Sequence, residues 1–184
     1  AGTVFLVVSA VSAAVGAAEP APAAGPLVGA YYYPWYYKER WTAEPVTHTP
    51  ALGWYSSSDQ GVARTHVRQA REAGLDFFLV SWLSRDGREG RNLDAALLPA
   101  CTAAGFRFAL LYETPLALGL PAGKPIDLDT VLPDGVKAGD RFVAHFDEIA
   151  ATYLAHPHYL RVGERPLIVI YLVRDLVHAG PYLT

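Results

Sequence analysis

Cysteine, methionine and clustered positive charge are scarce or absent in this sequence of 184 residues, which has one Cys and no Met. The single thiol, Cys101, excludes an internal disulfide and a zinc site built on paired cysteines. We expect Cys101 to be a small buried side chain, because nothing near it in sequence would lower its pKa. Lys and Arg number 15 against 18 Asp and Glu and form no basic run. The charge pattern predicts no nucleic-acid partner.

Motifs for cofactors, metals and an activated serine are missing as well. No Gly-x-Gly-x-x-Gly follows the first apolar segment, no His-x-His pair ends it, and no Gly-x-Ser-x-Gly occurs. The pair His156 and His158 lies in an expected turn, at the end of the fold opposite the loops that would carry function. His48 is the one histidine in such a loop, and ligand contact there stays an open alternative. The sequence predicts no cofactor and no metal site.

Long hydrophobic runs are also absent, and the one apolar stretch near the N-terminus is short. Residues 3–15 are apolar and small, and residues 17–26 are rich in Ala and Pro. A membrane span needs ~20 apolar residues, so this stretch fits the hydrophobic part of a signal peptide better. We predict that residues 1–26 are a signal-peptide-like segment, with an Ala/Pro linker as the alternative. The expectation is a secreted, periplasmic or cell-surface protein without a stable membrane span, folded over residues 27–184.

Strand and helix patterns alternate through the folded part. Continuous apolar runs without polar alternation are typical of strands covered on both faces, as in parallel sheets. Apolar residues at spacings of three and four, preceded by Asp or Asn and followed by Gly, predict helices. The predicted faces are Val62, His66, Ala70 and Ala73 in the first helix and Phe142, Phe146, Ile149 and Tyr153 in the last. Asp59 and Asn92 are the expected N-caps of the first two helices. The expected strands are 27–33, 75–82, 106–112 and 167–172, and the expected helices are 60–73, 92–105 and 140–155.

This alternation predicts an α/β fold with parallel strands. Two long loops, 35–58 and 114–139, follow strands, while the turns from helix to strand are short. A (β/α)8 TIM-type barrel builds its function from the loops after strands, whereas a doubly wound sheet would need a Gly-rich fingerprint. A complete barrel usually has ~250 residues. We therefore predict the first four β/α units of a barrel, that is, its N-terminal half.

Aromatic residues make up 12% of the chain and gather where the predicted strands end. The carboxyl ends of parallel strands meet at one rim, so these rings should surround a hollow there. Aromatic faces and hydrogen-bonding groups suit a sugar ligand. At least one of Tyr31 to Tyr33 must fill the core, because neighbouring strand residues point to opposite faces. The predicted substrate-binding residues are Tyr32, Tyr33, Trp35, Trp82, Glu113 and Tyr171.

Glu113 closes an otherwise apolar strand. Burial of an acidic group is costly unless something pairs with it. A structural ion pair with Arg107 or Arg174 is one interpretation, and a functional carboxyl group at the rim is the other.

Several short segments occur in a characteristic order, namely AYYYPWY at 30–36, LGWYSSSD at 52–59, His66, AGLD at 73–76, VSW at 80–82, Tyr112-Glu113, His156-Pro157, Tyr159 and 165–171. Together they resemble glycoside hydrolase family 99, the endo-α-mannosidase and α-mannanase group, with its family 71-like relatives. Pro34 stands where some members have an acidic residue, and residues 38–50 match no family segment.

The resemblance implies a (β/α)8 barrel that hydrolyses α-mannosidic or related glycans with retention of configuration. In the family, one carboxylate takes the proton from the sugar 2-OH and a second protonates the leaving oxygen. Both lie in a late Asn-Glu-Trp-x-Glu type segment, which is absent here and is expected C-terminal to Thr184. By resemblance, Trp82 and Glu113 line the donor-side sugar subsite.

Three hypotheses remain open from the sequence. The first is a glycoside hydrolase whose longer parent is active while this chain alone is inactive. The second is a polysaccharide-processing glycosyltransferase-like protein on the same barrel. The third is a carbohydrate-binding protein without catalysis. In each, the expected partner is an oligosaccharide or polysaccharide.

Overall fold

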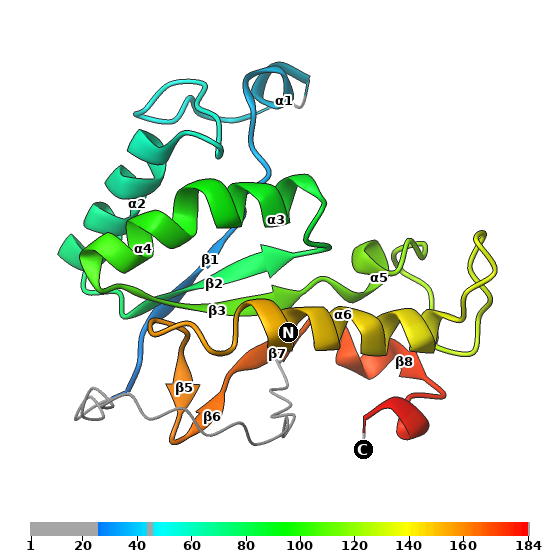
Figure 1. Ribbon diagram of the computed structural model, residues 1–184. Helices are drawn as coiled ribbons and strands as arrows, with labels where there is room; N and C mark the ends of the chain where they lie inside the picture. The colour runs from blue at the N-terminus through cyan, green and yellow to red at the C-terminus, as the bar shows by residue number, and fades with distance from the viewer. Residues whose placement is uncertain (1–25, 44–45, 184) are drawn as a thin grey trace.

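The computed structural model describes residues 26–43 and 46–183 (Figure 1). Residues 1–25, which hold most of the predicted signal-peptide-like segment, lie outside the described residues. The main elements are β1 (Gly29–Tyr32), α1 (Lys38–Ala43), α2 (Gln60–Glu72), β2 (Phe77–Trp82), α3 (Arg88–Asn92), a π-helical turn (Leu93–Leu97), α4 (Leu98–Ala104), β3 (Arg107–Tyr112), α5 (Thr114–Ala117), β4 (Ile126–Asp127), α6 (Ala138–Thr152), β5 (Arg161–Val162), β6 (Arg165–Pro166), β7 (Ile168–Ile170) and β8 (Leu176–Val177). Single turns of 3₁₀ helix cover Val173–Asp175 and Gly180–Tyr182.

The largest sheet in the described part has four parallel strands in the order β1-β2-β3-β7. Its register pairs Tyr32 with Val80, Trp82 with Tyr112, and Tyr112 with Ile170. The four predicted strands therefore pair in chain order, and the predicted α/β class with a parallel sheet is confirmed. β1 and β7 are the edges of this sheet within the described residues, and closure into a barrel stays a prediction.

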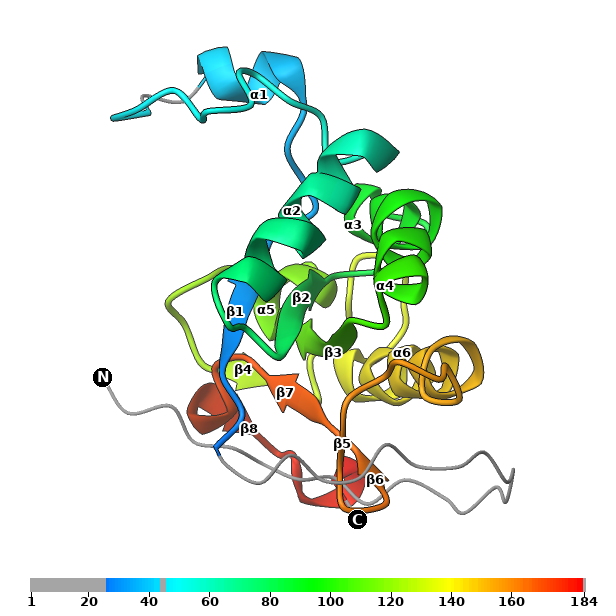
Figure 2. The same cartoon turned by 90° about the vertical axis from the view of Figure 1, so that its left-hand side faces the viewer.

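Helices cover one face of the sheet, as Figure 2 shows for α4 and α6. The main hydrophobic core lies between these helices and strand side chains such as Val80, Leu110 and Tyr112. The alternating strand residues Leu79, Ala109 and others form a smaller cluster on the opposite face. Successive strand side chains point to opposite faces, so each strand supplies both clusters. This alternation decides which rim residues can reach a ligand.

Helix α2 begins where the sequence predicts. The Asp59 side chain accepts hydrogen bonds from the backbone N–H groups of Gly61 and Val62, which satisfies two donors that the first turn leaves free. Its buried stripe contains Ala63, Val67 and Ala70. His66, expected on that stripe, is only partly buried and contacts Tyr32 and Tyr55 instead.

The predicted cap at Asn92 is wrong. The helix begins four residues earlier, with Gly87 as N-cap, and runs through the π-helical turn into α4. Asn92 is buried, and its amide donates a 2.7 Å hydrogen bond to the carbonyl of Pro34. That bond ties the loop after β1 to the helix layer. The predicted end at Gly105 is confirmed by its left-handed conformation, φ 61°.

The loops after β3 and β7 meet at the carboxyl end of the sheet. β4 pairs with β8 as a separate parallel ribbon, and the loop after β3 also contains the short α5. The predicted stripe of the last helix is confirmed, since Phe142, Phe146 and Ile149 of α6 pack into or against the main core. No helix among residues 26–43 and 46–183 has the length and apolar character that crossing a bilayer requires.

Candidate functional site

Two sets of side chains leave the carboxyl ends of β2 and β3 in opposite directions. Val80 and Trp82 point into the helix layer, so Ser81 between them points to the other face. Tyr112 likewise joins the helix-side core, and Glu113 follows it. We call the face that carries Ser81 and Glu113 the open face.

Glu113 is the only buried acidic residue in the described part of the chain, with 6% of its surface exposed. Its carboxylate oxygen Oε1 accepts a 3.0 Å hydrogen bond from Ser81 Oγ. Burial raises the pKa of Glu113, the hydrogen bond from Ser81 works against this, and the nearby charge of Glu89 adds to it. A carboxyl group in this state holds its proton to higher pH than an exposed one, and its two forms can donate to or accept from a hydroxyl.

The backbone fixes Glu113 at the rim. Its N–H donates to the carbonyl of Trp82 at 3.2 Å, which continues the ladder between β2 and β3. The alternative of a structural ion pair is not what the structure shows. Arg107 pairs with Asp76 at 3.2 Å, and Arg174 lies 3.5 Å from Asp175.

Tyr33 and Tyr171 stand beside Glu113 with rings that reach solvent. Their exposed fractions are 36% and 47%. Burial raises the pKa of Tyr33, and the charge of Glu113 adds to this. Tyr32 and Ile170 pack on the helix side, so Tyr33 and Tyr171, which follow them, point to the open face. The Tyr171 backbone is held on both sides, because its carbonyl accepts from Thr114 Oγ1 at 2.6 Å and its N–H donates to Tyr112. The structure therefore brings three of the six predicted residues together.

Trp35 extends the same group. Its ring stacks on Tyr33 with centroids 4.5 Å apart and an interplanar angle of 23°. Its indole N–H is buried and has no hydrogen-bond partner among the described residues. Trp35 thus continues the aromatic wall from the open face into the loop after β1.

Trp82 does not line the hollow, and its predicted place is wrong. The side chain is 0% exposed in the helix-side core. It stacks on Tyr112 at 5.9 Å and meets the His145 ring edge-on at 5.3 Å. The physical reason is strand alternation, because Ser81 takes the open face and leaves Trp82 the opposite one.

Tyr32 also points to the helix side. Its hydroxyl lies 3.2 Å from His66 Nδ1, and its ring contacts Phe78 at 4.8 Å. Burial raises the pKa of Tyr32 and lowers that of His66. Tyr32 borders a cavity of about 430 Å³ beside β1 and α2, and neither Ser81 nor Glu113 lines it. Tyr33 lines the same cavity, and the predicted role of Tyr32 in substrate binding stays a prediction.

Ser81 was missed as a site residue. Alternation puts Ser81 on the face opposite Trp82, and the register pairs Ser81 with Leu111, two residues before Glu113. Ser81 and Glu113 are therefore diagonal neighbours on one face, which is close enough for a hydrogen bond.

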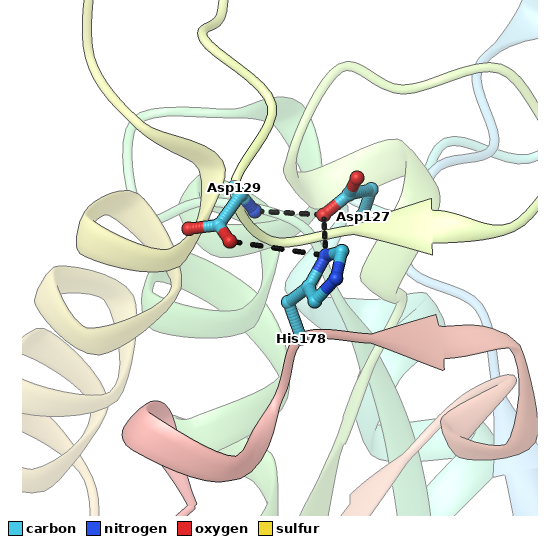
Figure 3. Close-up of side chains that lie close together, drawn as sticks. All are labelled: Asp127, Asp129 and His178. Carbon is cyan, nitrogen blue, oxygen red and sulfur yellow. Dashed lines mark hydrogen bonds and ion pairs between the residues drawn. The ribbon is translucent and has the colours of Figure 1, made fainter.

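A second polar cluster lies where β4 and β8 pair (Figure 3). His178 Nδ1 is 2.8 Å from Asp127 and 3.8 Å from Asp129. These three side chains are the only group within residues 26–43 and 46–183 whose ligand atoms could converge on a metal ion. All three reach solvent, and Lys137 already pairs with Asp129 at 3.3 Å. The hydrogen bond that His178 Nδ1 donates to the Asp127 carboxylate raises the pKa of His178.

Comparison with known proteins bears on the fold. No protein-family model matches the chain. The GH99 endo-α-mannosidase of Bacteroides thetaiotaomicron, in complex with BIS-TRIS-propane, superposes with a TM-score of 0.60 over 81% of this chain and 43% of that chain, at 20% identity. The chain has a glycoside hydrolase family 99-like fold. A glycoside hydrolase-like protein superposes with a TM-score of 0.53 over 85% of this chain and 45% of its own, at 22% identity.

One sequence relative is much longer than this chain. The uncharacterised protein WxcX of Xanthomonas campestris pv. campestris, found in two strains, is 30% identical over 123 residues, which is 65% of this chain. The chain spans 17% of the length of that relative and less than half of the solved structures with the family 99-like fold.

Proposed function

We propose that this chain forms the sugar-binding part of a glycoside hydrolase that acts on α-mannosidic or related glycans. The observation that carries the proposal is Glu113, a nearly buried carboxyl group that Ser81 holds on the same face of the sheet as the exposed rings of Tyr33 and Tyr171. The family 99-like fold supports the choice of substrate class, since two of the solved structures are endo-α-mannosidases.

The parts of the site suit different parts of a sugar. The exposed faces of Tyr33 and Tyr171 stack on the C–H face of a pyranose ring. The Glu113 carboxyl forms hydrogen bonds with ring hydroxyls, and the surrounding low-polarity wall strengthens them. Ser81 holds that carboxyl in one orientation. These groups bind and orient a sugar.

Hydrolysis needs two carboxyl groups placed about the glycosidic bond. Glu113 is the buried acid of the described residues, and we propose it as a binding residue. We also propose that the catalytic pair lies after Thr184. We propose further that the protein is exported to a secreted, periplasmic or surface location.

Calorimetric titration of the chain with α-mannose oligosaccharides tests the proposal. We expect binding that weakens about 10- to 100-fold in Glu113→Gln, the loss of one charge-assisted hydrogen bond. Glu164→Gln is the matched control, because Glu164 is an exposed acid at the turn between β5 and β6. Equal affinity of wild type and Glu113→Gln, or no glycan binding by wild type, would overturn it.

The other two hypotheses differ in the products they predict. A transferase moves sugar to an added acceptor, a hydrolase releases it to water, and a binding protein yields neither. Product analysis of the longer protein with acceptor sugars separates the three.

A further inference from the structure

The aromatic wall of the open face does not stop at Trp35. Its contacts continue through the loop after β1, from Trp35 to Tyr36 at 6.5 Å, from Tyr36 to Trp41 at 4.2 Å, and from Trp41 to Trp54 at 6.0 Å. Together with the stack of Trp35 on Tyr33, these contacts join the site at Glu113 to a residue 21 positions further along the chain than Tyr33. We call the rings of Tyr36, Trp41 and Trp54 the loop platform.

Hydrogen bonds hold the loop platform in place. Trp41 Nε1 donates to the carbonyl of Tyr55 at 2.8 Å. The backbone N–H of Tyr36 donates to Ser57 Oγ at 3.1 Å. The backbone N–H of Ser57 in turn donates to the Tyr36 carbonyl at 2.8 Å. Trp41 is buried and stacks on Tyr36 with an interplanar angle of 12°. The outermost ring, Trp54, therefore rests on a fixed support.

Trp54 itself faces solvent, with 38% of its surface exposed. Leu52, two residues earlier in the chain, is exposed as well. A large exposed ring on a rigid base marks a contact surface rather than a core position. Two serines follow Trp54 closely in the chain, Ser56 and Ser58, and their Oγ atoms form a 2.8 Å hydrogen bond at the surface. A flat apolar face bordered by hydroxyl groups matches a sugar unit, which has the same two kinds of surface.

We propose that the loop platform, with Trp54 as its outer ring, binds the part of a polysaccharide chain that runs beyond the site at Glu113. The inference rests on the proposed function and names its substrate class as a long glycan. Continuity of the ring contacts with Tyr33 favours a glycan over a second copy of this chain, since a single ligand would then follow both surfaces.

Chain-length dependence of binding tests the inference. The probes are a soluble α-mannan and a mannose trisaccharide, titrated into wild type, Trp54→Ala, Trp54→Phe and Val131→Ala. We expect Trp54→Ala to bind the mannan roughly five- to tenfold more weakly, the loss of one stacked ring, while its affinity for the trisaccharide stays the same. Trp54→Phe should keep most of the mannan affinity. Val131→Ala is the control, because Val131 is exposed on a different loop.

Three results would overturn the inference. Trp54→Ala could bind the mannan as wild type does, or it could bind both probes equally weakly, which would place Trp54 in the site at Glu113. A change from dimer to monomer in Trp54→Ala would show that the surface joins two copies of the chain. In each of these cases trisaccharide binding by wild type leaves the proposed function standing. If wild type binds neither probe, the proposed function fails and the inference fails with it.

Unchanged near-ultraviolet circular dichroism and an unchanged melting temperature show that each Trp54 variant is folded. If Trp54→Ala has a lower melting temperature than wild type, mannan binding by Trp54→Phe tests the inference instead, because this variant keeps an aromatic ring against Trp41.

Discussion

The two faces of the four-stranded sheet carry similar residues in different surroundings. On the helix face, Trp82 and Tyr112 stack on each other and are 0% exposed. On the open face, Tyr33 and Tyr171 keep a third to a half of their surface in solvent beside a carboxyl group. Aromatic rings therefore stabilise the fold on one face and are available to a ligand on the other.

Surroundings also set the state of the titratable groups. On the helix face, burial lowers the pKa of His145, and its Nδ1 lies 3.0 Å from the hydroxyl of Tyr112. On the open face, burial raises the pKa of Glu113, while Ser81 supplies a hydrogen bond that opposes this. The pKa of the acid on the open face is thus raised above its ordinary value, on the same face as rings that can touch a sugar.

Removing one aromatic ring from each face should have the largest effect, because one variant should lose stability and the other should lose glycan affinity. Trp82→Ala removes a fully buried indole and should cost about 3–5 kcal/mol of unfolding free energy. Tyr33→Ala removes an exposed ring and should cost less than about 1 kcal/mol while weakening glycan binding. Urea unfolding followed by circular dichroism measures both. Equal stability losses would contradict the assignment of the two faces.

The pH dependence of stability should also distinguish the two faces through Glu113, with a smaller change in unfolding free energy. Because its folded pKa is raised, its contribution favours folding fully below the unfolded value of ~4.3 and is lost as pH rises through the folded pKa. The urea midpoint of wild type should fall relative to that of Glu113→Gln as pH rises from about 4 to about 7. Ser81→Ala should steepen this fall, because it removes the bond that lowers the pKa. A constant difference across that range would show that Glu113 is an ordinary exposed acid.

The smallest effect belongs to the cluster of β4 and β8, which lies on neither face. The pKa of His178 is raised by its hydrogen bond to Asp127, so that bond favours folding below ~6.5 and its contribution is lost as pH rises through the raised value. Asp127→Asn should bring the pKa of His178 back toward its ordinary value. An NMR titration of the His178 ring measures this, and the stability of the exposed pair should barely change. If the pKa of His178 is the same in wild type and Asp127→Asn, the hydrogen bond between the two side chains does not form.

The sequence predicted the elements of the fold well because they have local signals. Asp59 before α2, Gly105 after α4 and the Phe142 stripe of α6 are such signals, and the structure confirms each. Glu113 also stood out in the sequence, since an acid that ends an apolar strand is rare without a reason.

The orientation of the rim residues was harder to predict. Buried strands of a parallel sheet are apolar on both faces, so the pattern of β2 does not reveal which residues face the helices. Trp82 was placed on the wrong side for that reason, and the sequence left open which of Tyr31 to Tyr33 fills the core. Asn92 and the pair of β4 with β8 depend on contacts between distant segments, which no local pattern records.

Fluorine NMR of the chain labelled with 3-fluorotyrosine tests the central claim most directly. During titration with an α-mannose oligosaccharide, the signals of Tyr33 and Tyr171 should shift, and those of Tyr112 and Tyr153 in the helix-side core should stay in place. Assignment by single Tyr→Phe variants makes each signal specific. Shifts confined to Tyr112 and Tyr153, or no shifts at Tyr33 and Tyr171 at saturating sugar, would contradict a sugar-binding open face.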